Sequence, residues 1–98
     1  MTKTDEVKRI GKLVYNEIEK HIGRVINLEE TEYSVILTNN HWPKRRAIFT
    51  VSCGSMYCYI YHWDYDRNEW ECRSEMKAHP FENKLVFLSG MLYGNLTD

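Results

Sequence analysis

The 98-residue sequence predicts an α+β protein, with an N-terminal amphipathic helix, an antiparallel meander sheet of three to four strands and a C-terminal helix. Three observations predict this class. Apolar residues recur at helical spacing near the N-terminus, β-branched and aromatic residues alternate through the middle of the chain, and helical spacing returns after Pro80. The length is typical of one domain, which we expect to cover residues 1–98.

The first segment favours a helix because its apolar residues form one stripe: Val7, Ile10, Val14, Ile18 and Ile22. Thr4 is the expected N-terminal cap, and Asp5 and Glu6 suit the positive end of the helix dipole. Gly23 is the expected stop.

The middle of the chain favours strands, because β-branched and aromatic residues alternate there with polar ones. The expected strands are Tyr33 to Thr38, Arg46 to Cys53, Met56 to Tyr65 and Glu69 to Met76, with a further short one open at Arg24 to Leu28. The segment from Asn39 to Lys44 is expected to be a loop, since Pro43 cannot donate to a ladder.

The C-terminal segment favours a helix that begins near Pro80 and stops at Gly94, with one apolar face formed by Phe81, Leu85, Leu88 and Leu92. A fifth strand at Lys84 to Leu88 is the alternative. Because this helix would be apolar on nearly all sides, it needs a second burying partner. The sheet with the first helix could provide it, and so could another subunit, which makes a homodimer an open expectation.

Aromatic residues occupy every second position of one expected strand: Tyr57, Tyr59, Tyr61, Trp63 and Tyr65. A period of two places them on one face of the sheet. That face is either the core or a surface that binds something, and the flanking turns decide between the two.

The preceding turn predicts that the tyrosines point away from the core. Gly54-Ser55 suits a two-residue type II′ hairpin, which pairs Cys53 with Met56, Val51 with Cys58, and Phe49 with Ile60. Directly paired residues share a face, so these apolar pairs form the core face. The tyrosines then lie on the opposite face, beside Ser52, Thr50, Ile48 and Arg46.

The following turn also predicts that the tyrosines point away from the core, provided that Asp66-Arg67-Asn68 is a three-residue loop. Tyr61 then lies beside Arg73, and Trp63 beside Glu71. A four-residue loop would instead put Trp70, Cys72 and Met76 beside the tyrosines and make their face the core, because a one-residue slip moves every side chain to the other face. We expect the exposed arrangement.

The best candidate surface is therefore aromatic, and its partner-binding residues would be Tyr57, Tyr59, Tyr61, Trp63, Arg46 and Arg73. Tyr, Trp and Arg dominate the hot spots of protein interfaces. Trp63 beside Arg46 could also form a cation–π pair. The loop residues Trp42, Lys44 and Arg45 are a second candidate, for phosphates or an acidic partner.

Other features narrow the function classes. A net charge of -1 gives no global attraction for nucleic acid, and no apolar run suggests a membrane span. Three cysteines are a poor disulfide framework, which fits a cytoplasmic protein. Cys58, His62 and Cys72 would share a face but lack the close spacing of a zinc site.

With no catalytic constellation, metal or cofactor expected, the leading hypothesis is a small non-enzymatic protein-binding module, such as an inhibitor, an immunity-type protein or an adaptor. The alternative is binding of single-stranded nucleic acid or a nucleotide through the 41–46 loop and the same aromatics. Glu71 and Glu75 beside those aromatics would argue against the alternative.

Overall fold

The computed structural model describes residues 2–97 except 23–25, and for residue 22 the backbone only. A long helix α1 (Lys3–Ile22) precedes five strands, and two helices end the chain. The strands are β1 (Asn27–Glu30), β2 (Ser34–Asn39), β3 (Arg45–Ser52), β4 (Ser55–Asp64) and β5 (Glu69–Lys77); the helices are α2 (His79–Asn83) and α3 (Leu85–Thr97). The sheet is an antiparallel meander in the order β1-β2-β3-β4-β5. The predicted α+β class is confirmed, with five strands rather than three to four.

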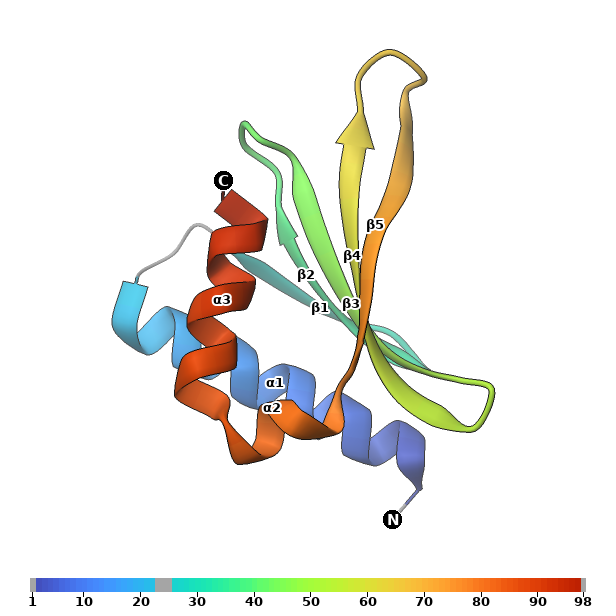
Figure 1. Ribbon diagram of the computed structural model, residues 1–98, viewed down its shortest axis with the longest axis vertical. Coiled ribbons are helices and arrows are strands. Elements are labelled where there is room, and N and C mark those ends of the chain that lie inside the picture. The colour runs from blue at the N-terminus through green and yellow to red at the C-terminus, as the bar shows by residue number, and fades with distance from the viewer. Residues whose placement is uncertain (1, 23–25, 98) are drawn as a thin grey trace.

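The core lies between the helices and one face of the sheet, here called the inner face (Figure 1). The helical stripe is buried as predicted at Val7, Ile10, Val14 and Ile18. It packs on inner-face residues of three strands: Val35, Leu37, Ala47, Phe49, Cys58 and Ile60. A Cβ at Gly11 would lie 3.0 Å from the Val35 side chain, so glycine allows α1 to approach the sheet closely.

The N-terminus of α1 differs from the prediction by two residues. Thr2 rather than Thr4 is the cap: the Asp5 backbone N–H donates to Thr2 Oγ1 at 3.1 Å, and the Thr2 backbone N–H donates to the Asp5 carboxylate at 3.3 Å. This reciprocal pair satisfies donors that the first helical turn leaves free. The predicted stop at Gly23 and the start of a strand at Arg24 lie outside the described residues, and β1 begins at Asn27.

The C-terminal segment is helical, as predicted, rather than a fifth strand at Lys84 to Leu88. It forms two helices, because the backbone of Lys84 leaves the helical region with φ -131 and ψ 44. The predicted stop at Gly94 is wrong, since α3 continues to Thr97. Burial of Leu92 and Leu96 stabilises α3 on both sides of Gly94, and packing of this kind overrides the weak helix propensity of glycine.

The β3–β4 turn uses different residues from those predicted but leaves the faces unchanged. The two turn residues are Cys53 and Gly54, both with positive φ (51 and 78), rather than Gly54 and Ser55. Phe49 therefore pairs with Cys58 instead of Ile60. This register differs from the prediction by two residues, and because side chains alternate with a period of two, the tyrosines still point away from the core.

The β4–β5 connection is a four-residue loop, so the predicted three-residue loop is wrong. Trp63 pairs with Trp70, and Tyr61 with Cys72. Beyond this point a β-bulge at Arg73 changes the register, and Tyr59 pairs with Glu75 as the shorter loop would have required. The tyrosine face is thus not the core, because the bulge returns Met76 to the inner face opposite Cys58.

Candidate functional site

The sheet has an outer face on which aromatic side chains from β4 and β5 lie together. We call these five residues the aromatic face: Tyr57, Tyr59, Tyr61, Trp63 and Trp70. Each is partly exposed. All three described helices lie on the inner side of the sheet (Figure 1). Within the described chain, therefore, no helix covers this face.

The rings contact one another along the sheet. Tyr57 and Tyr59 stack with centroids 5.6 Å apart, and Trp63 meets Trp70 edge to face at 5.3 Å. Beyond the strand ends, Trp42 lies against Tyr65 at 5.2 Å. Aromatic pairs at these separations add stabilisation beyond their buried area. The rings therefore support one another and present a preformed surface.

Three cations lie over these rings. Lys44 Nζ is 4.3 Å from the Trp63 centroid, and Arg46 Cζ is 4.2 Å from the Trp70 centroid. Lys77 Nζ is 4.8 Å from the centroid of Tyr57. The predicted pair of Arg46 with Trp63 is thus replaced: Lys44 covers Trp63, while Arg46 lies opposite Tyr61 in the register. These are cation–π distances, so the positive charges are held at the ring surfaces.

The middle of the aromatic face is partly dehydrated. Desolvation is the main cause that lowers the pKa of Arg46 and raises the pKa of Tyr61. Arg46 Nε is also buried with no hydrogen-bond partner. Side chains that have already lost water and rotational freedom lose less of both on binding a partner.

Two of the predicted site residues lie elsewhere. Arg73 occupies the bulge rather than a position opposite Tyr61, and its Nε is 3.7 Å from the Glu71 carboxylate. Arg45 lies on the inner face, opposite His62. Since Lys44 contacts the outer-face tryptophans, the expected loop site of Trp42, Lys44 and Arg45 is divided between the two faces.

Trp70 and Lys77 also belong to this surface, although neither was predicted from the sequence. The alternative of a four-residue loop would have placed Trp70 beside the tyrosines. No feature of the sequence predicts the bulge, which keeps the rest of this face polar. The same change separates Cys72 from Cys58 and His62, because Cys72 lies opposite Tyr61 on the outer face. The three residues considered for zinc are therefore divided between opposite faces.

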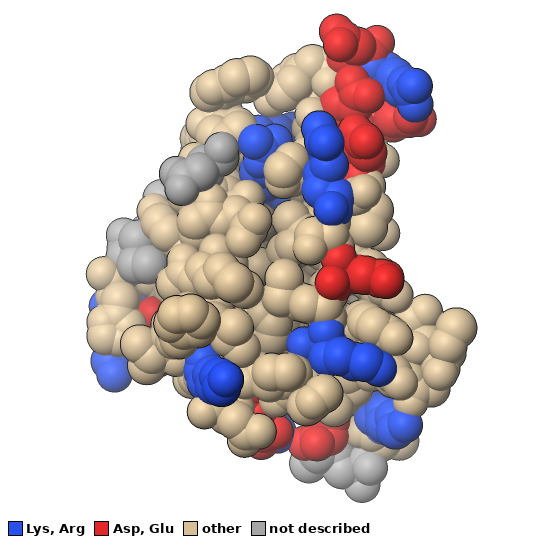
Figure 2. Space-filling view, in the orientation of Figure 1, with Lys and Arg blue, Asp and Glu red and all other residues tan. Residues whose placement is uncertain are grey.

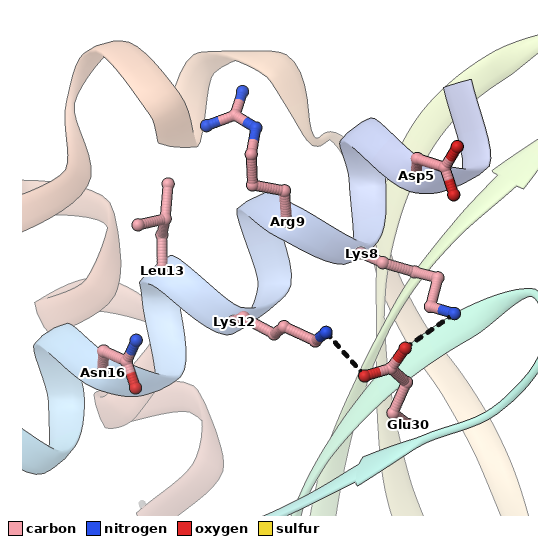
Figure 3. Close-up of a pocket in the computed structure, with 7 residues that line it drawn as sticks. All are labelled: Asp5, Lys8, Arg9, Lys12, Leu13, Asn16 and Glu30. Carbon is pink, nitrogen blue, oxygen red and sulfur yellow. Dashed lines mark ion pairs between the residues drawn. The ribbon is translucent and has the colours of Figure 1, made fainter. Parts of the chain in front are cut away.

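A separate hollow lies beside α1 and the edge strand β1 (Figure 3). Glu30 accepts from Lys12 at 2.6 Å and from Lys8 at 2.8 Å. These two hydrogen bonds, that from Lys12 first, lower the pKa of Glu30 to about 2. Because each lysine is already paired with this carboxylate, we interpret the cluster as structural: its two ion pairs hold β1 against α1.

Comparison of the chain with protein-family models, curated proteins and solved structures gives no match in any of the three. No helix in the described ranges is long and apolar enough to cross a membrane. Inferences about function therefore depend on the chemistry of the surfaces described above.

Proposed function

We propose that this protein is a non-enzymatic binding module that docks its aromatic face on another protein, as inhibitors, immunity-type proteins and adaptors do. The observation that carries this proposal is a set of mutually packed, partly exposed rings on a sheet face that none of the described helices covers. Tyrosine and tryptophan offer large contact areas with few torsions to immobilise. Tyr59, Tyr61 and Trp63 would make the contact, with Arg46 fixing the orientation.

A capture experiment with matched variants tests this proposal. The immobilised protein and a Tyr61→Ala/Trp63→Ala variant are each exposed to native lysate, and any captured protein is purified and its affinity for both is measured. Tyr33→Ala is the control, since Tyr33 is 66% exposed and outside the aromatic face. We expect the double variant to bind at least about 100-fold more weakly, because hot-spot residues contribute 2 kcal/mol or more each. Equal affinity of all three proteins would contradict the proposal.

Single-stranded nucleic acid is a second candidate, favoured by two specific observations. Three cations lie on the rings, and Glu71, expected beside Trp63, is instead paired with His62 on the inner face. Bases stack on aromatic rings and phosphates attract cations, so this arrangement suits the ligand better than the expected one. Glu75 remains on the outer face opposite Tyr59, and the overall net charge is -1.

Anisotropy of a labelled single-stranded oligonucleotide distinguishes the two candidates. Nucleic-acid binding should weaken steeply as salt rises, because cations that contact phosphates release counterions. Lys44→Gln should reduce the salt dependence as well as the affinity. Absence of binding at low salt would eliminate this candidate and leave the protein-docking proposal standing.

We further propose homodimerisation through α3. The helix buries Leu92 and Leu96 inward but leaves Val86 and Phe87 70% and 72% exposed, with Met91 at 38%. Exposed apolar clusters of this kind are typical of interaction sites. The helix contains no Asp, Glu, Lys, Arg or His, so a second uncharged α3 suits it without burying a charge.

Sedimentation over a range of protein concentrations tests the dimer. The wild type should pass from monomer to dimer, whereas Phe87→Glu should stay monomeric because a carboxylate would be buried in the contact. Tyr33→Glu is the matched control, with a similarly exposed ring outside α3. A wild type that stays monomeric at high concentration would contradict dimerisation.

A cytoplasmic location also remains a proposal. It is supported by the free thiols of Cys53 and Cys72, which are exposed and would be oxidised in a secretory compartment. Immunofluorescence or cell fractionation would test it.

A further inference from the structure

A cavity of about 320 Å³ lies at one end of the sheet, beside the β3–β4 turn and the start of α1. Its lining comes from α1, β4, β5 and the first residue of α2: Lys3, Ser55, Met56, Lys77 and His79. The volume falls within the range of small-molecule sites, which is roughly 300–1,000 Å³. None of the described residues that line this cavity is an Asp or Glu, so the lining suits a negatively charged ligand.

Buried neighbours fix the backbone around this cavity. Ala78 is fully buried, and its N–H donates to the Met56 carbonyl at 2.9 Å, which ties the end of β5 to the start of β4. Phe81 is also fully buried and holds α2 against the core. Lys77 and His79, on either side of Ala78, are exposed. Their side chains can therefore meet a ligand while the backbone that carries them is held in place.

The two lysines of the cavity make contacts that leave their charges unneutralised. Lys3 Nζ donates to the Gly54 carbonyl, and Lys77 Nζ lies 4.8 Å from the centroid of the Tyr57 ring. Neither lysine forms an ion pair with any described residue, and this includes Glu75, two positions before Lys77 in β5. Because an ammonium group has three N–H donors, each lysine keeps donors for a ligand.

The hollow beside α1 differs in this respect. Its basic residues are already paired, Lys8 and Lys12 with Glu30, and Arg9 with Glu6 and Glu82. Near the end of β5 and the start of α1, by contrast, Figure 2 shows two groups of basic atoms close together, with acidic atoms to either side rather than between them. The positive charge at this end of the sheet is therefore available to a ligand.

We propose that this cavity binds a small molecule by a phosphate group, with Lys3, Lys77 and His79 donating to the phosphate oxygens. A phosphate monoester carries about -1.5 to -2 charges at pH 7 and has three acceptor oxygens, which suits donors that come from three different elements. Lysine binds phosphate as a point charge, whereas planar carboxylates are matched best by the fork of an arginine. The Ser55 hydroxyl is a further donor, and Met56 supplies an apolar wall for the rest of the ligand.

An NMR titration of the histidine ring signals with inorganic phosphate, at constant pH and ionic strength, tests the site. The signals of His79 should shift and saturate as phosphate is added, while those of His21, His41 and His62 stay in place because none of them lines this cavity. Succinate, a dicarboxylate of similar charge, should bind more weakly. No shift of His79 at millimolar phosphate, equal shifts of all four histidines, or equally tight binding of succinate would overturn the proposal.

Matched lysine variants make the test specific. Lys3→Gln and Lys77→Gln should each weaken phosphate binding by about tenfold or more, because each removes a charged hydrogen-bond donor. Both lysines are exposed, so these variants should fold. Lys84→Gln is the control, since it removes the same charge from an exposed residue between α2 and α3 that does not line the cavity. Equal affinities of the three variants would show that only net charge matters, and would overturn the proposal.

This site does not depend on the protein-docking proposal, although Lys77 contacts Tyr57 of the aromatic face. The Tyr61→Ala/Trp63→Ala variant should bind phosphate as tightly as the wild type, since neither residue lines the cavity. A wild type that binds no phosphate would overturn the cavity proposal alone and leave the docking proposal standing.

Discussion

Replacing Phe49 or Tyr61 by alanine tests which face of the sheet carries the core. Phe49 is 0% exposed and meets Phe81 edge to face at 5.5 Å, so its removal leaves a cavity between the sheet and the helices. Core Phe→Ala changes lower the free energy of unfolding by about 3–5 kcal/mol, against roughly 5–15 kcal/mol for a whole protein. Phe49→Ala should therefore unfold at a much lower temperature, or not fold at all.

Tyr61→Ala should have a far smaller effect, because none of the described helices covers its ring on the outer face. The change removes a contact with Arg46, whose Cζ lies 5.6 Å from the ring centroid, and some apolar area. Such cation–π contacts contribute about 0.5–1 kcal/mol at exposed sites. For a domain of this size each kcal/mol shifts Tm by about 4–8 °C. We therefore expect a fall of about 2–8 °C for Tyr61→Ala and of roughly 12–40 °C for Phe49→Ala.

Far-UV circular dichroism during thermal and urea unfolding provides the comparison, since its signal comes mainly from the backbone. Phe49→Leu is a useful intermediate, because it retains most of the apolar volume and should lose less stability than alanine. Equal losses for Phe49→Ala and Tyr61→Ala would refute the division into inner and outer faces, and with it the basis of the docking proposal.

Three further outcomes follow from the structure. Urea unfolding of Gly90→Ala should show a gain of about 0.5–1 kcal/mol, because a Cβ there meets nothing within 4 Å and alanine favours the helix, whereas Gly11→Ala should lose stability against Val35. Above pH 4.5 the lowered pKa of Glu30 stabilises the folded protein, and this stabilisation should be lost as the pH falls to about 2. When unfolding is measured over this pH range, Glu30→Gln should therefore lose less stability than the wild type. A thiol reagent monitored by mass should modify the two exposed cysteines of the native protein but Cys58 only after unfolding, because burial raises the pKa of that thiol.

The elements of this fold could be predicted from the sequence because each has a strong local signal. Helical spacing marks Val7 to Ile18, and alternation marks the strand that ends near Asp64. The outward direction of the tyrosines was also predicted correctly, although the turn at Cys53-Gly54 was not. An error of two residues in the β3–β4 register leaves every side chain on the same face of the sheet. The predicted direction of the tyrosines is therefore correct although the predicted turn is wrong.

The details of the candidate site were less predictable because they depend on hairpin register, which one residue can change. The loop before Glu69 is one residue longer than predicted, and it brings Trp70 onto the aromatic face. The bulge at Arg73 has no sequence signature of its own, because it reflects the competition between burying Met76 and pairing Trp63 with Trp70. Local sequence patterns do not predict a bulge that depends on contacts between two strands.

The bulge at Arg73 also affects the exposed edge of the sheet. β5 is an edge strand of nine residues, and an edge of that length presents backbone groups on which a foreign strand could add. The bulge interrupts that edge near its middle, and Glu69, Glu71, Glu75 and Lys77 place charges along it. Extension of the sheet into fibres is thereby discouraged, even though the same two strands display a broad aromatic surface. The sheet can therefore display partly exposed rings on one face without presenting an uninterrupted backbone edge to other strands.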